Sequence, residues 1–285
     1  MKPEIVIRAS STSGYADCQL RAIVQAMPHV LAEHGYSLSP SRPHIGALVG
    51  SGVHGAGELG LTEKMKGSVT PLSALEDAGI ETFRARMDEE AQEGGEVILD
   101  DVSARVDLAE KQIRRMAGRW RIDILSTVRP AAVESRINAG IPGHDGVTLS
   151  GQADLLAVAF EEDGSTKLRD LKTGKICKAA VSHAPQLGCY SMLWRTLGHN
   201  PASASIDFLQ RVKIDKDQPK TVVQDLDIDR CEEIAWSVVN DMASKARILA
   251  ETGDPSHILT NPSSMLCSGK FCRAHGNKIC PATRS

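Results

Sequence analysis

The chain has 285 residues, a formal net charge of −3 and a hydrophobic content of 41%. This hydrophobic content is enough for a core, and the small net charge argues against a protein that binds polyanions through bulk charge alone. The first residues, MKPEIVIRASS, lack the apolar stretch of a signal peptide, and the chain has no run of about 18 apolar residues. We therefore expect a soluble, cytoplasmic protein without a membrane segment, whose seven cysteines are metal ligands or core thiols more than disulfides.

The first half of the chain predicts mainly helices. Residues 1–16 are polar and extended, and a helix begins near Cys18 and is interrupted at Pro28. Residues 72–125 carry apolar positions at helical spacing and predict two or three helices. The acidic surplus of residues 57–110, fourteen acidic against five basic side chains, is typical of a solvated face that a nucleic acid would avoid.

Between these helices, residues 45–61 (IGALVGSGVHGAGELGL) are unusually rich in glycine. Each glycine inside a helix costs about 1 kcal/mol relative to alanine, so this density indicates that the backbone packs closely against a neighbouring segment. If the segment is helical, Gly50 and His54 lie on one face. By itself, His54 is more easily explained as an ordinary core or surface histidine.

Strands follow after residue 130. Residues 131–138 predict a strand that contains Glu134, which is either an outward-facing residue or a site carboxylate. Two neighbouring strands, 151–160 and 166–175, are joined by turn residues 161–165.

Charged residues lie inside this strand pair. Asp154 is in its first strand, and Asp170 and Lys172 are two residues apart in the second, so these two side chains share one face. Two carboxylates and a lysine at one place suit a divalent cation and a phosphate. The alternative is a surface hairpin with solvated charges.

The remaining chain predicts a helix, a hairpin, a second helix and an irregular tail. In the first of these helices Gln186 and Tyr190 share a face, being four residues apart. The predicted segments are helix 183–198, strands 205–214 and 219–226, helix 227–252 and tail 255–285.

Taken in order, these residues resemble the RecB-type branch of the PD-(D/E)xK nuclease superfamily. The matching elements are Gly50–His54 (GxxxH), Glu134, Gly151–Asp154 (GxxD), Asp170–Gly174 (DxKTG) and Gln186–Tyr190 (QxxxY). The resemblance implies one nuclease domain over residues 1–285, with a restriction-endonuclease-like α/β core: a central mixed β-sheet flanked by helices. It also implies a helical insertion over residues 56–128 and a C-terminal cysteine module over residues 255–285 that closes on Cys18.

The resemblance also implies roles for individual residues. Lys172, Asp170, Asp154 and Glu134 would be catalytic. His54, Asp154, Asp170 and the carbonyl of Leu171 would bind Mg²⁺ or Mn²⁺. Gln186, Tyr190 and Lys175 would contact DNA or brace the site.

Four cysteines extend the likeness to the iron–sulfur members of this group, which include the AddB-type nuclease domain, CRISPR adaptation nucleases and phage exonucleases. The residues concerned are Cys18, Cys267, Cys272 and Cys280. Four thiolates are the usual ligands of a [4Fe–4S] cluster, here expected to be structural. The C-x4-C-x7-C spacing departs from the commoner C-x2-C-x5-C, which leaves room for zinc or for His275 as a ligand.

The leading interpretation is a metal-dependent DNA exonuclease that acts in recombination, repair or the processing of phage or mobile-element DNA. The alternative is a non-catalytic DNA-binding or assembly subunit with a zinc-stabilised cysteine module. No Walker A motif is present, since neither Gly-Lys pair is followed by Ser or Thr. Any helicase motor would therefore be a separate chain, and the expected partners are DNA and a recombinase, a single-strand annealing protein or a helicase.

Overall fold

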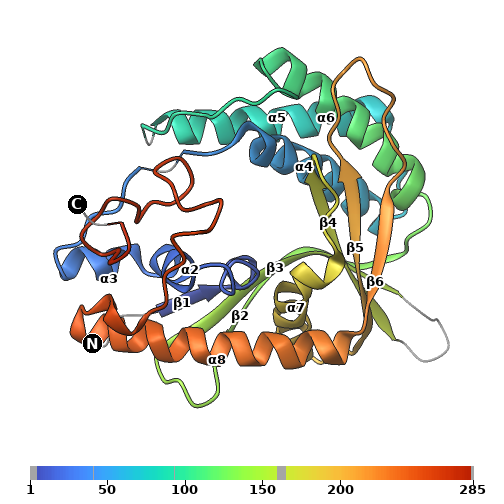
Figure 1. The fold of residues 1–285 in the computed structure, drawn as a ribbon. Coiled ribbons are helices and arrows are strands. Elements are labelled where there is room, and N and C mark those ends of the chain that lie inside the picture. Colours follow the sequence, from blue (N-terminus) through green and yellow to red (C-terminus); the bar gives the residue numbers. More distant parts are fainter. Residues whose placement is uncertain (1–4, 41, 93, 159–164, 284–285) are drawn as a thin grey trace.

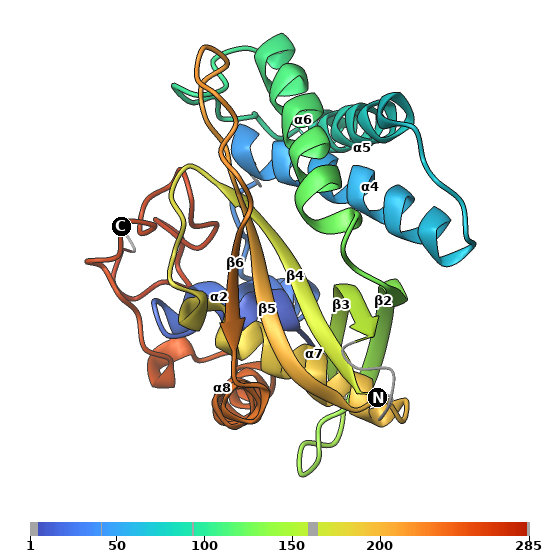
Figure 2. The same ribbon diagram turned by 90° about the vertical axis from the view of Figure 1, so that its right-hand side faces the viewer.

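In the computed structural model, a six-stranded sheet separates two groups of helices. The structure describes residues 5–40, 42–92, 94–158 and 165–283. Helices α4, α5 and α6 cover one side of the sheet, and α7 and α8 lie on the other (Figures 1 and 2). This architecture confirms the predicted central mixed sheet flanked by helices.

The sheet mixes parallel and antiparallel neighbours. Its strand order is β1-β3-β4-β5-β6, with β2 also paired to β3. The β1–β3 and β4–β5 pairs are parallel, and the β2–β3, β3–β4 and β5–β6 pairs are antiparallel. The strands are β1 (Ile5–Arg8), β2 (Pro130–Gly140), β3 (Val147–Val158), β4 (Thr166–Gly174), β5 (Pro201–Gln210) and β6 (Val222–Leu226).

Three long helices, α4, α5 and α8, provide most of the two helical layers. Helix α8 begins at Asp227, whose carboxylate accepts from the backbone N–H of Arg230, and ends at Gly253, whose φ of 68° is left-handed. The α-helices are α1 (Ala9–Thr12), α2 (Gln19–Ala26), α3 (Pro28–Glu33), α4 (Ile45–Met65), α5 (Leu72–Gln92), α6 (Val106–Trp120), α7 (Ala184–Thr196) and α8 (Ile228–Thr252). Shorter helical turns are η1 (π, Arg121–Leu125), η2 (3₁₀, Ala180–His183) and η3 (3₁₀, Pro255–His257).

Each side of the sheet has its own hydrophobic core. Leu168 of β4 packs into the core shared with α2, α7 and α8, and Leu171 of the same strand packs into the core shared with α4, α5 and α6. The two leucines are three residues apart, so alternation along the strand directs them to opposite faces. The short segment between them therefore lies where both cores meet.

Most predicted elements are present, with informative differences. The hairpin is confirmed as β5 and β6, and Pro28 begins a new helix. The polar segment 1–16 contains both β1 and α1, which composition did not indicate because each has only four residues. The predicted start of the insertion, residue 56, lies inside α4, so this helical layer begins upstream of it. Turn residues 161–164 lie outside the described residues.

The C-terminal tail runs beside α2 and α3 and has little regular structure (Figure 1). It is held to the N-terminal part by a hydrogen bond from the Leu20 N–H to the Leu259 carbonyl, 3.3 Å long. The Ser264 hydroxyl also donates to Asp17, at 2.7 Å. Among the described residues, no helix is long and apolar enough to cross a membrane.

Candidate functional site

The site begins at a fork in the sheet. One edge of β3 pairs first with β1, up to Ser150, and later with β4, from Leu155 onward. Residues 151–154 of β3 lie between these two ladders and pair only with β2 on the other edge. At this gap, the carboxylate of Asp154 accepts a hydrogen bond of 2.6 Å from the backbone N–H of Leu171 on β4. The Asp154 side chain thus accepts a hydrogen bond from β4 just before the backbone pairing of β3 with β4 begins at Leu155.

Glu134 lies opposite Asp154 in the β2–β3 ladder, between the pairs Val133–Leu155 and Ser135–Ala153. It has a left-handed φ of 44°, the only such angle on a described residue other than glycine. A left-handed backbone is strained for a side chain of this kind and persists where its surroundings impose it.

The strand changes its packing around this strained residue. Val133 packs against the α4–α6 core, whereas Ile137, four residues later, packs in the core on the other side of the sheet. A regular strand would direct both side chains to one face. The irregular geometry at Glu134 therefore brings its carboxylate to the junction of the two cores.

His54 of α4 completes a group of three possible metal ligands with Glu134 and Asp154. Its Nδ1 lies 3.2 Å from Oδ1 of Asp154 and 3.8 Å from Oε1 of Glu134. One ligand atom from each residue lies within 4.8 Å of the others. The three side chains are 30%, 12% and 14% exposed, in the order His54, Glu134, Asp154, so the group is sheltered but reachable.

Asp170 and Lys172 of β4 lie beside this group. The Lys172 ammonium is 2.6 Å from Oδ2 of Asp170. Both oxygens of Asp170 are buried, and no described residue donates a well-directed hydrogen bond to them. Burying a carboxylate without donors is costly unless a cation compensates it. We call His54, Glu134, Asp154, Asp170 and Lys172 the carboxylate centre.

Charge within the carboxylate centre shifts the protonation of its members. Burial alone would lower the pKa of His54, but the charges of Asp154 and Glu134 outweigh it and raise this pKa to about 10. Burial raises the pKa of Asp170 above its usual range, against the opposing charge of Lys172. Burial lowers the pKa of Lys172, but the neighbouring carboxylates dominate and raise it. The carboxylates beside Lys172 thus favour its charged form, which can donate hydrogen bonds.

These residues fit a divalent cation. Two carboxylates and an imidazole converge, and a further buried carboxylate, Asp170, lies beside them and is paired with Lys172. Oxygen ligands suit Mg²⁺ and Mn²⁺, and imidazole is an accepted ligand of transition metals. The predicted ligands His54 and Asp154 lie together, and Glu134, predicted as catalytic, joins them. Asp170, the other predicted carboxylate ligand, lies against Lys172.

Two glycines of the predicted motifs make room for this arrangement. A Cβ atom on Gly50 would lie 2.7 Å from the Thr173 hydroxyl, so the glycine lets α4 approach β4. A Cβ atom on Gly151 would lie 2.6 Å from Leu193 and 3.0 Å from Tyr190, so this glycine admits α7. The close packing expected for the glycine-rich segment is thus confirmed at Gly50.

The predicted DNA-contacting residues Gln186 and Tyr190 form a buried pair. The Gln186 amide donates to the Tyr190 hydroxyl at 2.7 Å. Burial raises the pKa of Tyr190, and the charge of Asp170 adds to this shift. The hydroxyl therefore stays protonated, and the pair braces the site from α7.

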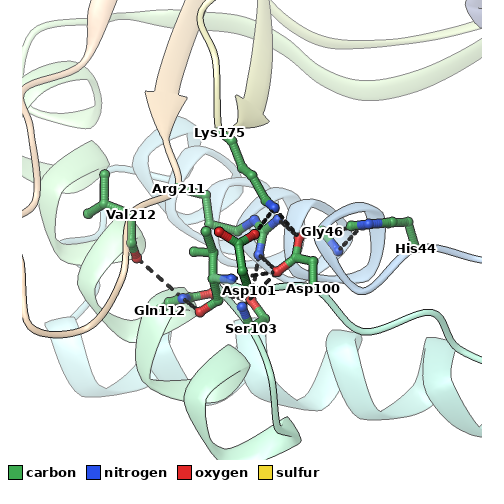
Figure 3. Close-up of polar contacts among 10 residues, drawn as sticks. His44, Gly46, Asp100, Asp101, Ser103, Gln112, Lys175, Arg211 and Val212 are labelled. Carbon is green, nitrogen blue, oxygen red and sulfur yellow. Dashed lines mark hydrogen bonds and ion pairs between the residues drawn. The ribbon is translucent and has the colours of Figure 1, made fainter. Parts of the chain in front are cut away.

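Lys175, also predicted to contact DNA, takes part in a network of polar contacts at the ends of β4 and β5 (Figure 3). Its ammonium lies 3.3 Å from Asp100 and forms an ion pair with Asp101. Arg211, 3% exposed, pairs with Asp100 and donates to the Ser103 hydroxyl at 2.5 Å. We call Asp100, Ser103, Lys175 and Arg211 the Asp100 clasp. These contacts attach the loop before α6 to the ends of β4 and β5. Lys175 is three residues after Lys172 of the carboxylate centre.

Sequence reasoning missed several residues near the site. Gln152 donates to Glu134 at 2.9 Å, and its amide oxygen accepts from Arg136 at 3.1 Å. Burial, with a smaller effect from Lys172, lowers the pKa of His183 to about 4. Gln152 lies within the GxxD element, where its position two residues before Asp154 on one strand could have revealed it. Nothing local in the sequence indicates His183.

The four predicted cluster cysteines are brought together although 249 residues separate Cys18 from Cys267. They line one pocket, together with His275, between the start of α2 and the tail. Among the described residues, no three of these sulfur and nitrogen atoms lie within 4.8 Å of one another. Cys189 and Cys231 are buried elsewhere and Cys177 is exposed, so these three thiols are outside the group.

A family model described as the PD-(D/E)XK nuclease superfamily matches residues 8–281. Among solved structures, the chain is similar to a candidate exonuclease of Eubacterium rectale, with 12% identity and a TM-score of 0.56, over 92% of this chain and 86% of that one. The structure of SSO0001 is 14% identical over 80% of this chain and 97% of that one, and its TM-score of 0.36 is too low to indicate a shared fold. No curated protein matches the chain.

Proposed function

Because the chain belongs to the PD-(D/E)XK nuclease superfamily, we propose that it is a Mg²⁺- or Mn²⁺-dependent deoxyribonuclease that removes nucleotides from DNA ends. The observation that carries this proposal is the convergence of His54, Glu134 and Asp154 beside the Asp170–Lys172 pair. The exonuclease description of the Eubacterium rectale protein supports action at ends.

Each member of the carboxylate centre has a distinct task in this proposal. His54, Glu134 and Asp154 would hold the cation. Asp170 lies beside them, adds negative charge to the site and pairs with Lys172. The bound cation would polarise a phosphate oxygen and lower the pKa of a water molecule. Lys172, protonated at neutral pH, donates hydrogen bonds to the phosphate oxygen on which charge develops. Gln186 and Tyr190 brace β3 through Gly151, which keeps Asp154 in place.

Cleavage of end-labelled single- and double-stranded DNA tests the proposal, with Mg²⁺, with Mn²⁺ and with EDTA. Substrates blocked at the 5′ or the 3′ end separate exonuclease from endonuclease action. Loss of cleavage in Asp170→Ala is the expected result. Metal-independent cleavage, or equal cleavage by Asp170→Ala and the wild type, would contradict the proposed mechanism. A wild type that binds DNA but never cuts it would favour the non-catalytic subunit.

We further propose that Cys18, Cys267, Cys272 and Cys280 bind a structural [4Fe–4S] cluster. All four cysteines line one pocket, which supports a ligand that they share, and four thiolates are the usual ligands of this cluster. Brown protein with absorbance near ~400 nm after anaerobic purification is expected. Colourless protein containing stoichiometric zinc would instead support the zinc module.

The pathway and partner chains stay predictions. A helicase would supply the motor activity for which this sequence has no Walker A motif, and a recombinase or an annealing protein would act on the processed DNA. Co-purification from a host that expresses the tagged protein tests for such a partner.

A further inference from the structure

A second polar pocket lies at the fork in the sheet, next to the carboxylate centre. Residues of β1, β2 and β3 line it, among them Arg8, Arg136, Ser150 and Gln152, together with Ser10 of α1 and Tyr190 of α7. The space between its atoms, open solvent included, is about 590 Å³. We propose that this pocket, here called the Arg8–Arg136 pocket, binds a phosphate group of the DNA strand that is cut, next to the phosphate at which cleavage occurs. The inference rests on the proposed function and names a subsite for its substrate.

The pocket is aligned with the carboxylate centre by strand register. Ser150, Gln152 and Asp154 occupy every second position of β3, although the strand changes its packing after Ala153, since Ala153 lies in one core and Leu155 in the other. Arg8 of β1 pairs with Ser150, and Arg136 of β2 pairs with Gln152. Two residues along a strand span about 6.8 Å. A DNA strand bound at Asp154 would therefore reach the pocket with its neighbouring phosphate.

The two arginines are free to bind an anion. Both side chains belong to exposed residues, and among the described residues neither lies within ion-pair distance of a carboxylate. Other arginines of the sheet differ: Arg169 forms an ion pair with Asp207 at 2.7 Å, and Arg211 pairs with Asp100. Guanidinium groups suit phosphate because their N–H groups bind two oxygens at once, and serine hydroxyls add donors.

Gln152 connects the pocket to the proposed metal ligands. Its amide oxygen accepts from Arg136 at 3.1 Å, and its amide nitrogen donates to Glu134 at 2.9 Å. The side chain is thus fixed between a cation and a carboxylate. A phosphate bound by Arg136 would lie next to this bridge, on the side away from the carboxylates, where their negative charge opposes it least.

The double variant Arg8→Gln/Arg136→Gln tests the pocket in the full-length protein. Its matched control is Arg86→Gln, which removes a charge from an exposed ion pair with Glu89 on α5. We expect KM for DNA to rise on the order of tenfold or more in the double variant, with kcat little changed. The slope of log affinity against log salt should fall by about 0.7 to 0.9 for each lost phosphate contact.

Substrate ends identify the phosphate. If the pocket binds a terminal phosphate, the wild type prefers 5′- or 3′-phosphorylated oligonucleotides over hydroxyl-ended ones, and the double variant loses this preference. If it binds an internal phosphodiester, KM rises equally for both kinds of end. A double variant with KM and salt dependence within twofold of Arg86→Gln on every substrate would overturn the inference.

Binding without cleavage separates this inference from the proposed function. Anisotropy of a fluorescent oligonucleotide in EDTA reports on the pocket even where no cut occurs. Weaker binding by the double variant than by Arg86→Gln supports the pocket whether or not the wild type cleaves DNA. Cleavage by the wild type with unaltered binding and KM in the double variant would refute the pocket and leave the nuclease intact.

Discussion

Side chains of the carboxylate centre project from paired strands and from a helix of 21 residues, whereas three of the four cluster cysteines lie in an irregular tail. In the carboxylate centre, register fixes Glu134 opposite Asp154, and two hydrophobic cores pack against the strands that carry them. In the cysteine module, residues 255–285 with Cys18, the tail lacks strand pairing among its described residues and is attached by hydrogen bonds to the N-terminal part and by buried side chains such as Ile258 and Ile279.

The two regions differ in what stabilises them: the fold positions the carboxylate centre, whereas the ligand of the cysteine module would itself stabilise the fold. The carboxylate centre should keep its shape when one of its side chains changes, because backbone pairing positions the rest. The cysteine module lacks backbone pairing of this kind among its described residues, and its ligand would add a direct link between the chain ends to the core packing of Ile279 and Cys280. Substitutions in the first region should therefore affect activity, and substitutions in the second should affect stability.

The largest expected effect is on activity in Lys172→Ala. We expect cleavage to fall about 10²- to 10³-fold, since a donor to the developing phosphate charge is lost. The free energy of unfolding should change by only about 1 kcal/mol, because buried Asp170 can take up a proton. Initial rates and urea denaturation measure the two effects. Lys167→Ala, near the start of β4 where the lysine pairs with Asp225 away from the carboxylate centre, is the control. Unaltered activity in Lys172→Ala would contradict the role assigned to this residue.

Removal of one cluster cysteine should have the opposite signature. In Cys280→Ala we expect loss of visible absorbance and a fall of about 4 kcal/mol in the free energy of unfolding, similar to the loss of a cross-link that closes a long loop. Limited proteolysis should cut the tail first. Cys177→Ala, an exposed cysteine outside the pocket, is the control. Equal thermal stability and equal proteolysis of Cys280→Ala and the control would argue against a link at this place.

Loss of Asp100 should come next. Asp100→Ala leaves Arg211 buried without its carboxylate, which costs about 3 kcal/mol. Asp101→Ala, which removes an exposed carboxylate from the same network, should destabilise the protein much less than Asp100→Ala. Urea denaturation compares the two variants. The double variant Asp100→Leu/Arg211→Met should recover part of the loss, and equal destabilisation by Asp100→Ala and Asp101→Ala would show that burial is unimportant here.

The smallest expected effect is the pH dependence set by Asp123. The Arg119 guanidinium, aided by a backbone donor from Thr221, lowers the pKa of Asp123 to about 2, against the effect of burial. A lowered pKa stabilises the fold above the carboxyl's usual pKa, and this contribution is lost as pH falls from about 4 toward 2. Asp123 should contribute roughly 1 kcal/mol. Asp123→Asn should therefore flatten stability over this pH range, and an unchanged acid profile would contradict the assignment.

Sequence reasoning identified the parts of the site that depend on local pattern. Asp154, Asp170 and Lys172 lie in strands whose alternation and turn residues are readable, whereas His54 was assigned to the site only through the family resemblance. The family resemblance added their common purpose. The carboxylate of Glu134 was placed in its strand, but its left-handed backbone was not foreseen, since that depends on two cores packing against the same strand.

The parts that sequence reasoning missed depend on contacts between distant segments. Arg211 and Asp100 are 111 residues apart, so no local pattern connects them. The same contact network occupies Lys175, which the motif alone assigned to DNA. Strand β1 was missed because four residues give too little periodicity, yet its register with β3 creates the Arg8–Arg136 pocket.

Diffraction from crystals soaked in Mn²⁺ tests the central claim most directly, because the anomalous signal locates the ion without relying on activity. The account predicts an anomalous peak within coordination distance of His54, Glu134 and Asp154, absent from crystals of Asp154→Asn. Mn²⁺ bound elsewhere, with this group empty in crystals of an enzyme that cleaves DNA with Mn²⁺, would contradict it.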